Sequence, residues 1–217
     1  MEDTFGARGR YWSEKAPFLS RWLWVLFWLV IPQSLASLLS GNILPAEYDG
    51  LLLLGQAFQL IYYLGCGLVL LKLSPLLSRY RTAGVCYAAG GVVSAAAALL
   101  PVSDDAGGLA MAVSLASLLG TLALLAAEYQ ECMGHSELVE ELSPDLSRQW
   151  RRLWKLFIGC YAALFVSVLL LAFSALLALF VTLAGTLGLL AVMILKLIYL
   201  YRTASLFRRL ARETPEP

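Results

Sequence analysis

Long uncharged stretches alternate with short charged segments along this chain, a pattern that predicts a bundle of membrane-spanning helices. Five runs contain no Asp, Glu, Lys or Arg: 22–46, 50–71, 82–103, 106–127 and 156–195. A single such charge near the bilayer centre costs about 2.5–3.5 kcal/mol on insertion scales. Each of the first four runs therefore has the composition and the length of one helix across a hydrocarbon core of about 30 Å.

The fifth run is 40 residues long. As one helix it would extend about 60 Å, twice the thickness of the hydrocarbon core. We therefore expect it to fold back as a hairpin, with its turn near 174–181. The predicted fold is all-α, a polytopic bundle of six transmembrane helices, over 22–40, 51–71, 83–101, 107–127, 156–175 and 178–200.

The charged residues separate into two groups when six spans are assumed. All 16 Lys and Arg residues then lie on one side of the membrane. The charged residues of the other side are acidic: Glu47, Asp49, Asp104 and Asp105. Because cytoplasmic loops carry the excess of Lys and Arg, the basic side is predicted to be cytosolic, with both termini inside, in the plasma membrane. Five or seven spans would mix the two groups.

The same topology predicts three regions along the chain. Residues 1–21 form a cytosolic interfacial segment, 22–201 a single membrane domain, and 202–217 a cytosolic basic tail. The motif Ser34-Leu35-Ala36 loosely fits a signal-peptide cleavage site. The uncharged run continues well past it, which favours an uncleaved first helix.

Composition supports lipid as the solvent. Hydrophobic residues make up 60% of the chain and charged residues 14%, with a mean hydropathy of +0.75; a soluble domain has about 45–50% and 25%. These values exclude a disordered chain, a fibrous protein, a disulfide-stapled secreted domain and a nucleic-acid binder. The lipid bilayer is the partner that they predict.

Short segments recur along the chain. Residues 21–27 and 151–157 share five of seven positions, and Tyr-Arg-Thr-Ala occurs at both 80–83 and 201–204. One interpretation is three related hairpins around a central site, as in some transporters. The other is chance similarity in a sequence rich in Leu and Ala.

Small residues are concentrated in the helix predicted over 83–101. Gly90, Ser94 and Ala98 follow one another at a spacing of four, as do Gly84 and Ala88. Such faces let helix backbones approach closely within a membrane. We expect this helix to be the most buried, packed inside the bundle rather than at an oligomer interface.

The polar segment 128–155 is predicted to form a cytosolic helical connection between the fourth and fifth spans. Ser143-Pro144-Asp145 is typical of a helix start. One face of the following helix is apolar: Leu146, Trp150, Leu153, Trp154 and Phe157. We expect an amphipathic helix near the membrane surface, which then turns into the fifth span and offers a docking surface for a protein partner.

Candidate chemistry is sparse. Glu128, Glu131, Cys132 and His135 lie along one helical face with donors that suit zinc or iron. His135 is the only histidine, however, and di-iron bundles need two Glu-x-x-His pairs. A solvated acidic face is the favoured interpretation, so we predict neither a metal nor a cofactor.

Polar residues within the predicted spans supply the candidate ligand site. Gln56, Gln59 and Tyr63 share one face of the helix over 51–71, in its outer half, and Gln33 lies beside Pro32 in the first span. One interpretation is that these residues line a small cavity that opens outward. The other is that they tie helices together by hydrogen bonds, worth about 0.6 kcal/mol each on average.

No acid, base or histidine occurs inside a span, so an enzyme is not expected. The favoured function is a structural or accessory membrane subunit that binds a partner. The alternative is a substrate-binding transporter subunit or a small solute carrier. In size, helix number and inward termini the chain is similar to the substrate-capture components of energy-coupling-factor vitamin transporters, a resemblance of topology.

Overall fold

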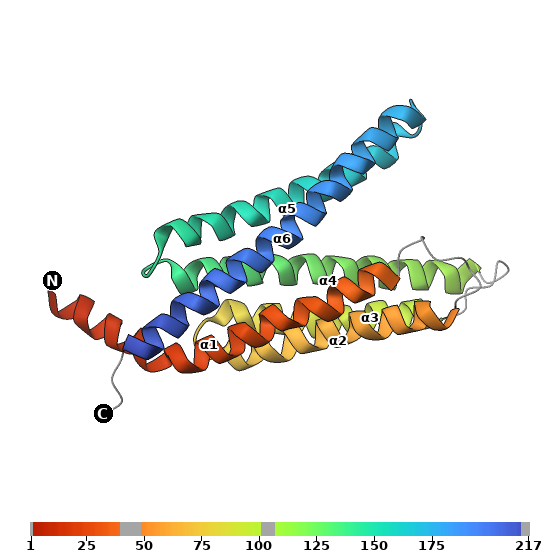
Figure 1. The fold of residues 1–217 in the computed structure, drawn as a ribbon. Coiled ribbons are helices and arrows are strands. Elements are labelled where there is room, and N and C mark those ends of the chain that lie inside the picture. Colours follow the sequence, from red (N-terminus) through yellow and green to blue (C-terminus); the bar gives the residue numbers. More distant parts are fainter. Residues whose placement is uncertain (1, 40–48, 101–106, 214–217) are drawn as a thin grey trace. The chain divides into compact units, whose positions relative to one another are not determined.

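The structure, a computed structural model, describes residues 2–39, 49–100 and 107–213. This part of the chain is all-helical, which confirms that the fold is all-α. It forms six helices (Figure 1): α1 (Glu2–Leu39), α2 (Asp49–Leu73), α3 (Ser78–Leu99), α4 (Gly107–Val139), α5 (Pro144–Leu170) and α6 (Ala175–Glu213).

Five of these helices, α2 to α6, are long and apolar enough to cross a membrane, as judged over the described residues. The chain is therefore consistent with a multi-pass membrane protein. The first predicted span belongs to α1, which is not among the five. Its expected end falls in 40–46, outside the residues that the structure describes, and the sixth span stays a prediction.

The chain divides into two compact units. Unit 1 comprises Met1–Pro17 and Cys132–Pro217, and unit 2 comprises Phe18–Glu131. Both boundaries fall inside helices, so α1 and α4 contribute one part to each unit. The predicted regions 1–21, 22–201 and 202–217, and the three hairpin repeats, remain predictions.

Glycines allow the helices of unit 2 to pack at very short distances. A Cβ added at Gly84 of α3 would lie 2.8 Å from the carbonyl oxygen of Gly67 on α2, and one added at Gly67 would lie 2.9 Å from that of Gly84. A Cβ at Gly90 would lie 3.0 Å from the carbonyl oxygen of Gly120 on α4. The small residues of α3 thus pack inside the chain, as expected.

The expectation that 83–101 is the most buried span is not confirmed. Among the five apolar helices, α2 and α3 are the most buried, with 33% and 28% of their apolar windows covered. Both are covered from two sides. Leu29 of α1 packs near Gly65 of α2, α2 and α3 meet at Gly67 and Gly84, and α4 packs on α3 at Gly90.

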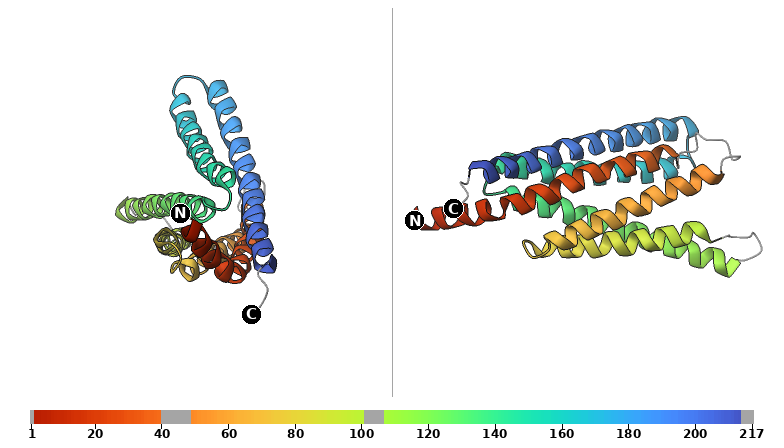
Figure 2. Two further views of the ribbon diagram at one scale, coloured as in Figure 1. Left: turned by 90° about the vertical axis from the view of Figure 1, so that its left-hand side faces the viewer. Right: turned by 60° about the horizontal axis from the view of Figure 1, so that its bottom comes forward.

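A close helical hairpin of α5 and α6 dominates unit 1 (Figure 2). The chain reverses after Leu170 and α6 starts at Ala175, slightly earlier than the turn expected at 174–181. Ser174 precedes the first residue of α6, and its Oγ accepts a hydrogen bond from the backbone N–H of Leu177 at 3.4 Å. A serine cap thus starts α6 in a turn that contains neither Gly nor Pro.

The segment after residue 143 differs from the expectation of a separate surface helix. The helix does begin at Pro144, as predicted, although Ser143 makes no side-chain capping bond. It then continues without a break to Leu170 as α5. No proline interrupts 145–170, so nothing in the sequence forces a bend between the polar start and the apolar remainder.

Candidate functional site

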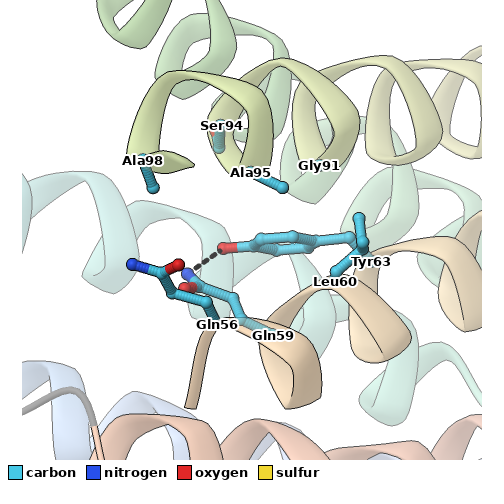
Figure 3. A pocket seen from close by; sticks show the side chains of 8 residues that line it. All are labelled: Gln56, Gln59, Leu60, Tyr63, Gly91, Ser94, Ala95 and Ala98. Carbon is cyan, nitrogen blue, oxygen red and sulfur yellow. Dashed lines mark hydrogen bonds between the residues drawn. The ribbon is translucent and has the colours of Figure 1, made fainter. Parts of the chain in front are cut away.

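A small cavity with some polar side chains in its lining lies between α2 and α3 of unit 2 (Figure 3). On α2 the lining residues are Gln56, Gln59, Leu60 and Tyr63. On α3 they are Gly91, Ser94, Ala95 and Ala98. Both sets follow the spacing i, i+3, i+4, i+7 of one helix face. Long side chains on α2 thus face small ones on α3, and the mismatch in size leaves the space between them.

A side-chain hydrogen bond at this cavity lies within α2. The Nε2 atom of Gln59 donates to the hydroxyl oxygen of Tyr63 at 3.1 Å, along one turn of the helix (Figure 3). The Tyr63 ring stacks on that of Tyr87 from α3, with a centroid distance of 6.3 Å and an interplanar angle of 22°. The two helices therefore meet here through stacked aromatic rings. The Gln59 amide and the Tyr63 hydroxyl form their hydrogen bond within α2 and not between the helices.

The size of the cavity limits what it can hold. Its volume is about 40 Å³, enough for water molecules, since one water needs roughly 10–15 Å³ on this measure. Pockets for organic ligands have about 300–1,000 Å³. In this conformation the cavity accommodates water or a solute of that size.

Three of the four predicted site residues, Gln56, Gln59 and Tyr63, line this cavity. Gln33, on α1, is half-buried and is not among the lining residues. The contribution of α3 was not predicted as part of the site, although two of its lining residues, Ser94 and Ala98, belong to the small-residue face seen in the sequence. Ligand binding by these residues stays a prediction.

A buried carboxylate lies near the other end of α3 in unit 2. Glu131 is 1% exposed, and its Oε2 accepts a hydrogen bond of 2.5 Å from the hydroxyl of Tyr87. Next to it in the sequence, Gln130 accepts a hydrogen bond from Arg79 at 3.0 Å. Both bonds join α4 to α3, so hydrogen bonds between side chains connect these two helices beyond the glycine contact.

The burial of Glu131 corrects the expectation of a solvated acidic face. Cys132 and His135, in unit 1, are also buried, at 3% and 0% exposure. The prediction treated the extension of α4 as a free helix, whereas neighbouring helices of the same chain cover it. Among the described residues, no group of three or more His, Cys, Asp or Glu is placed to hold a metal ion.

We expect Tyr87→Phe to destabilise unit 2. The substitution keeps the ring but removes the hydroxyl that bonds to the buried Glu131, and a buried polar group deprived of its partner costs about 1–3 kcal/mol. The free energy of unfolding in nanodiscs measures the effect. Tyr201→Phe is the control, because the Tyr201 side chain is 51% exposed. An equal, small change in both variants would contradict a stabilising role for the Tyr87–Glu131 bond.

In unit 1, a second buried polar cluster surrounds Trp150, and we call it the Trp150 cluster: His135, Trp150, Tyr199 and Thr203. Trp150 is fully buried, and its Nε1 donates to the Thr203 hydroxyl at 3.2 Å. The imidazole of His135 packs against the indole at a centroid distance of 4.6 Å. The Tyr199 ring contacts the indole edge-on, at a centroid distance of 5.8 Å. This cluster joins the end of α4, the start of α5 and the end of α6.

A network of polar side chains lies beside this cluster. The hydroxyls of Ser136 and Ser147 are 2.8 Å apart, and the Ser136 Oγ also accepts from Nε of Arg151 at 2.8 Å. Arg151 further pairs with Glu140 at 2.6 Å. Sequence reasoning missed this arrangement, because its members are 11 to 15 residues apart and meet only when α4 and α5 form an antiparallel pair.

The apolar face expected at the start of α5 is present. Leu146, Trp150 and Leu153 are buried, and Trp154 and Phe157 are half-buried. Helices of unit 1 itself cover this face, however, so it is not an open docking surface. Any partner at 128–155 therefore meets the polar side, where Arg148 and Arg152 are exposed.

Comparison with known proteins adds no assignment: no family model, curated protein or solved structure matches the chain. The cavity between α2 and α3 is water-sized. The side chains that line the cavity include no acid, histidine, cysteine or lysine, so they offer no pair for general acid–base or nucleophilic chemistry.

Proposed function

We propose that this multi-pass membrane protein works as a structural or accessory subunit that binds a protein partner and does not turn over a substrate. The observation that carries the proposal is the ordered polar end of unit 1. Four segments of the chain meet there, and the indole Nε1 of Trp12 in α1 donates to Glu141 at 3.1 Å. Connections between spans are commonly short, whereas this region forms a folded surface with its own buried cluster.

The apolar part of unit 1 supports the same proposal. Only 11% of the apolar window of α5 and 17% of that of α6 are buried within the chain. Near the turn, the Phe165 and Phe173 side chains are 68% and 86% exposed. Lipid or the helices of a partner would cover such a surface, and a large exposed apolar area is typical of interaction sites.

In this proposal both termini and the segment 128–155 lie in the cytosol and the protein resides in the plasma membrane. The positive-inside distribution of Lys and Arg supports that orientation. The exposed arginines Arg148 and Arg152 then face the cytosol, where an acidic surface of the partner would dock. Arg148 is already paired with Asp145, so Arg152 is the better candidate for contact with a partner.

The partner proposal is tested on the full chain, purified from its native membrane into nanodiscs and weighed by native mass spectrometry. A photo-crosslinking residue at position 152 should attach to a second polypeptide that is present in a fixed ratio. The same residue at position 153 is the control, because Leu153 is 2% exposed. A particle that contains only this chain, with no adduct at position 152, would contradict the proposal.

The alternative, a substrate-binding subunit or small solute carrier, is favoured by one observation, the cavity that Gln56, Gln59 and Tyr63 help to line. Its volume of about 40 Å³ restricts the solute to a very small polar molecule unless α2 and α3 separate. The same mass measurement distinguishes this alternative. A retained small molecule that is lost in Gln59→Leu would favour solute binding, and its absence would favour the accessory subunit.

The proposed orientation makes its own prediction. In a variant without native cysteines, a single cysteine at position 47 or 104 should react with a membrane-impermeant maleimide in intact cells. A cysteine at position 152 or 209 should react only after the membrane has been permeabilised, because those positions carry the basic residues of the cytosolic side. Labelling of position 152 in intact cells would overturn the orientation.

A further inference from the structure

We infer that a groove between the start of α5 and the end of α6 binds a phosphate group, as carried by the headgroup of an anionic phospholipid. The groove has a volume of about 260 Å³. The residues that line it are two arginines, three hydroxyl-bearing residues and two leucines: Arg202, Arg209, Ser143, Tyr201, Ser205, Leu146 and Leu206. All of these residues belong to unit 1, and this inference does not depend on the proposed partner binding.

The register of α6 brings the two arginines to one groove. Residues 202, 205, 206 and 209 follow the spacing i, i+3, i+4, i+7, so they lie on a single face. Ser205 lies between the two arginines on that face. This order of cation, hydroxyl and cation along one face suits an anion with several oxygen atoms, because guanidinium groups donate two parallel hydrogen bonds to phosphate.

The groove is electropositive. None of its lining residues is acidic. The acid nearest in sequence on the α5 side, Asp145, already pairs with Arg148. The first turn of α5 adds the positive end of a helix dipole beside Ser143, whose side chain makes no capping bond to that turn. Positive charge and hydroxyl-bearing residues therefore coincide in one groove.

Arg202 is held in position before any ligand arrives. Its Nη1 donates to Oε1 of Gln149 on α5 at 2.8 Å. A guanidinium group carries five N–H donors, so this single bond leaves others for an anion. A fixed side chain loses less conformational entropy on binding than a mobile one. The bond to Gln149 therefore favours specific binding of an anion over diffuse electrostatic attraction.

The position of the groove favours a lipid headgroup as the source of the phosphate. The uncharged part of the last span ends at Leu195, and Arg202 follows about 10 Å further along the helix. Tyr201, which is 51% exposed, is an aromatic residue of the type that concentrates at membrane–water interfaces. A groove of 260 Å³ also accommodates a phosphate together with its glycerol, with the acyl chains outside.

The test uses the full chain in nanodiscs of neutral phosphatidylcholine. Short-chain phosphatidylglycerol and, separately, inorganic phosphate are titrated, and binding is followed by thermal unfolding and native mass spectrometry. Arg202→Gln/Arg209→Gln should weaken phosphatidylglycerol binding about 30-fold, since each basic contact contributes about fivefold. Arg208→Gln/Arg212→Gln removes the same charge from the same helix end but from outside the groove, and should bind like the unmodified chain.

The single variant Arg209→Gln separates a loss of binding from a folding defect, because the hydrogen bond to Gln149 comes from Arg202 and stays intact. It should weaken binding about fivefold without lowering the unfolding temperature in phosphatidylcholine. If inorganic phosphate binds with the same variant pattern, the phosphate site is supported and its source is a soluble phosphate compound. Equal weakening by both double variants would indicate diffuse attraction to a basic tail and overturn the inference, as would the absence of binding to either probe.

Discussion

Gly84→Leu should destabilise unit 2 by about 3 kcal/mol, the upper part of the usual range for overpacking. A Cβ at this position would meet the carbonyl oxygen of Gly67 and Cγ of Leu71, each at 2.8 Å. The backbone oxygen cannot move aside without displacing α2. The larger side chain therefore has to separate the two helices along the contact that the glycines make. The free energy of unfolding in nanodiscs measures the loss.

Gly159→Leu is the matched control for this prediction. Gly159 lies in α5, within an apolar span, and an added Cβ would meet no atom within 4 Å. The same substitution there adds an apolar side chain to an open surface and removes a glycine from a helix interior, which is neutral or stabilising by up to about 1 kcal/mol. If both variants lost the same stability, the cost would come from leucine itself and the close approach of α2 and α3 would be wrong.

The helices of this protein could be predicted from the sequence because charge-free runs of the right length leave few alternatives. Five of the six expected spans correspond to helices that are apolar and long enough. The turn at Leu171–Ser174 was harder to place because it lies inside the uncharged run and contains neither Gly nor Pro. The local sequence signal for this turn is a single serine, Ser174, whose Oγ accepts a hydrogen bond from the backbone N–H of Leu177 at the start of α6.

Burial of the polar residues could not be predicted from the same pattern. Glu131 accepts a hydrogen bond from Tyr87, which is 44 residues away, and no periodicity along α4 contains that information. The same holds for His135, whose neighbour Trp150 lies on the next helix. An acidic helix face is equally compatible with solvent and with a bundle whose other helices extend as far, and only the tertiary contacts distinguish the two.

The candidate cavity shows which half of a site a sequence can reveal. The face of Gln56, Gln59 and Tyr63 follows from helical spacing alone. Two residues of the opposite wall, Ser94 and Ala98, were recognised as part of a packing face with Gly90 and not as a lining. The size of the cavity depends on how closely α2 and α3 approach, which the Gly67–Gly84 contact sets. The spacing of residues along one helix predicts which side chains share a face. The volume of the cavity depends on both helices that enclose it.

Trp150→Ala is the second change for which we expect a large effect, confined to unit 1. It removes a fully buried indole, and truncation of a buried aromatic residue costs about 3–5 kcal/mol because a cavity is left. It also leaves the Thr203 hydroxyl without the Nε1 donor. Hydrogen exchange should accelerate at 135–150 and 199–207, whereas amides of α2 and α3 should stay protected, because the two units are separately compact.

Two further variants separate packing from hydrogen bonding in that result. Trp150→Phe keeps most of the ring against His135 and loses the bond to Thr203, which should cost about 1 kcal/mol beyond the small change in packing. Trp154→Ala, one turn further along α5, removes a half-buried indole and should cost less than Trp150→Ala. If Trp150→Ala accelerated exchange equally in α2 and α3, the two units would unfold together. The polar end of unit 1 would then not be a separate element on which a partner-binding surface could be built.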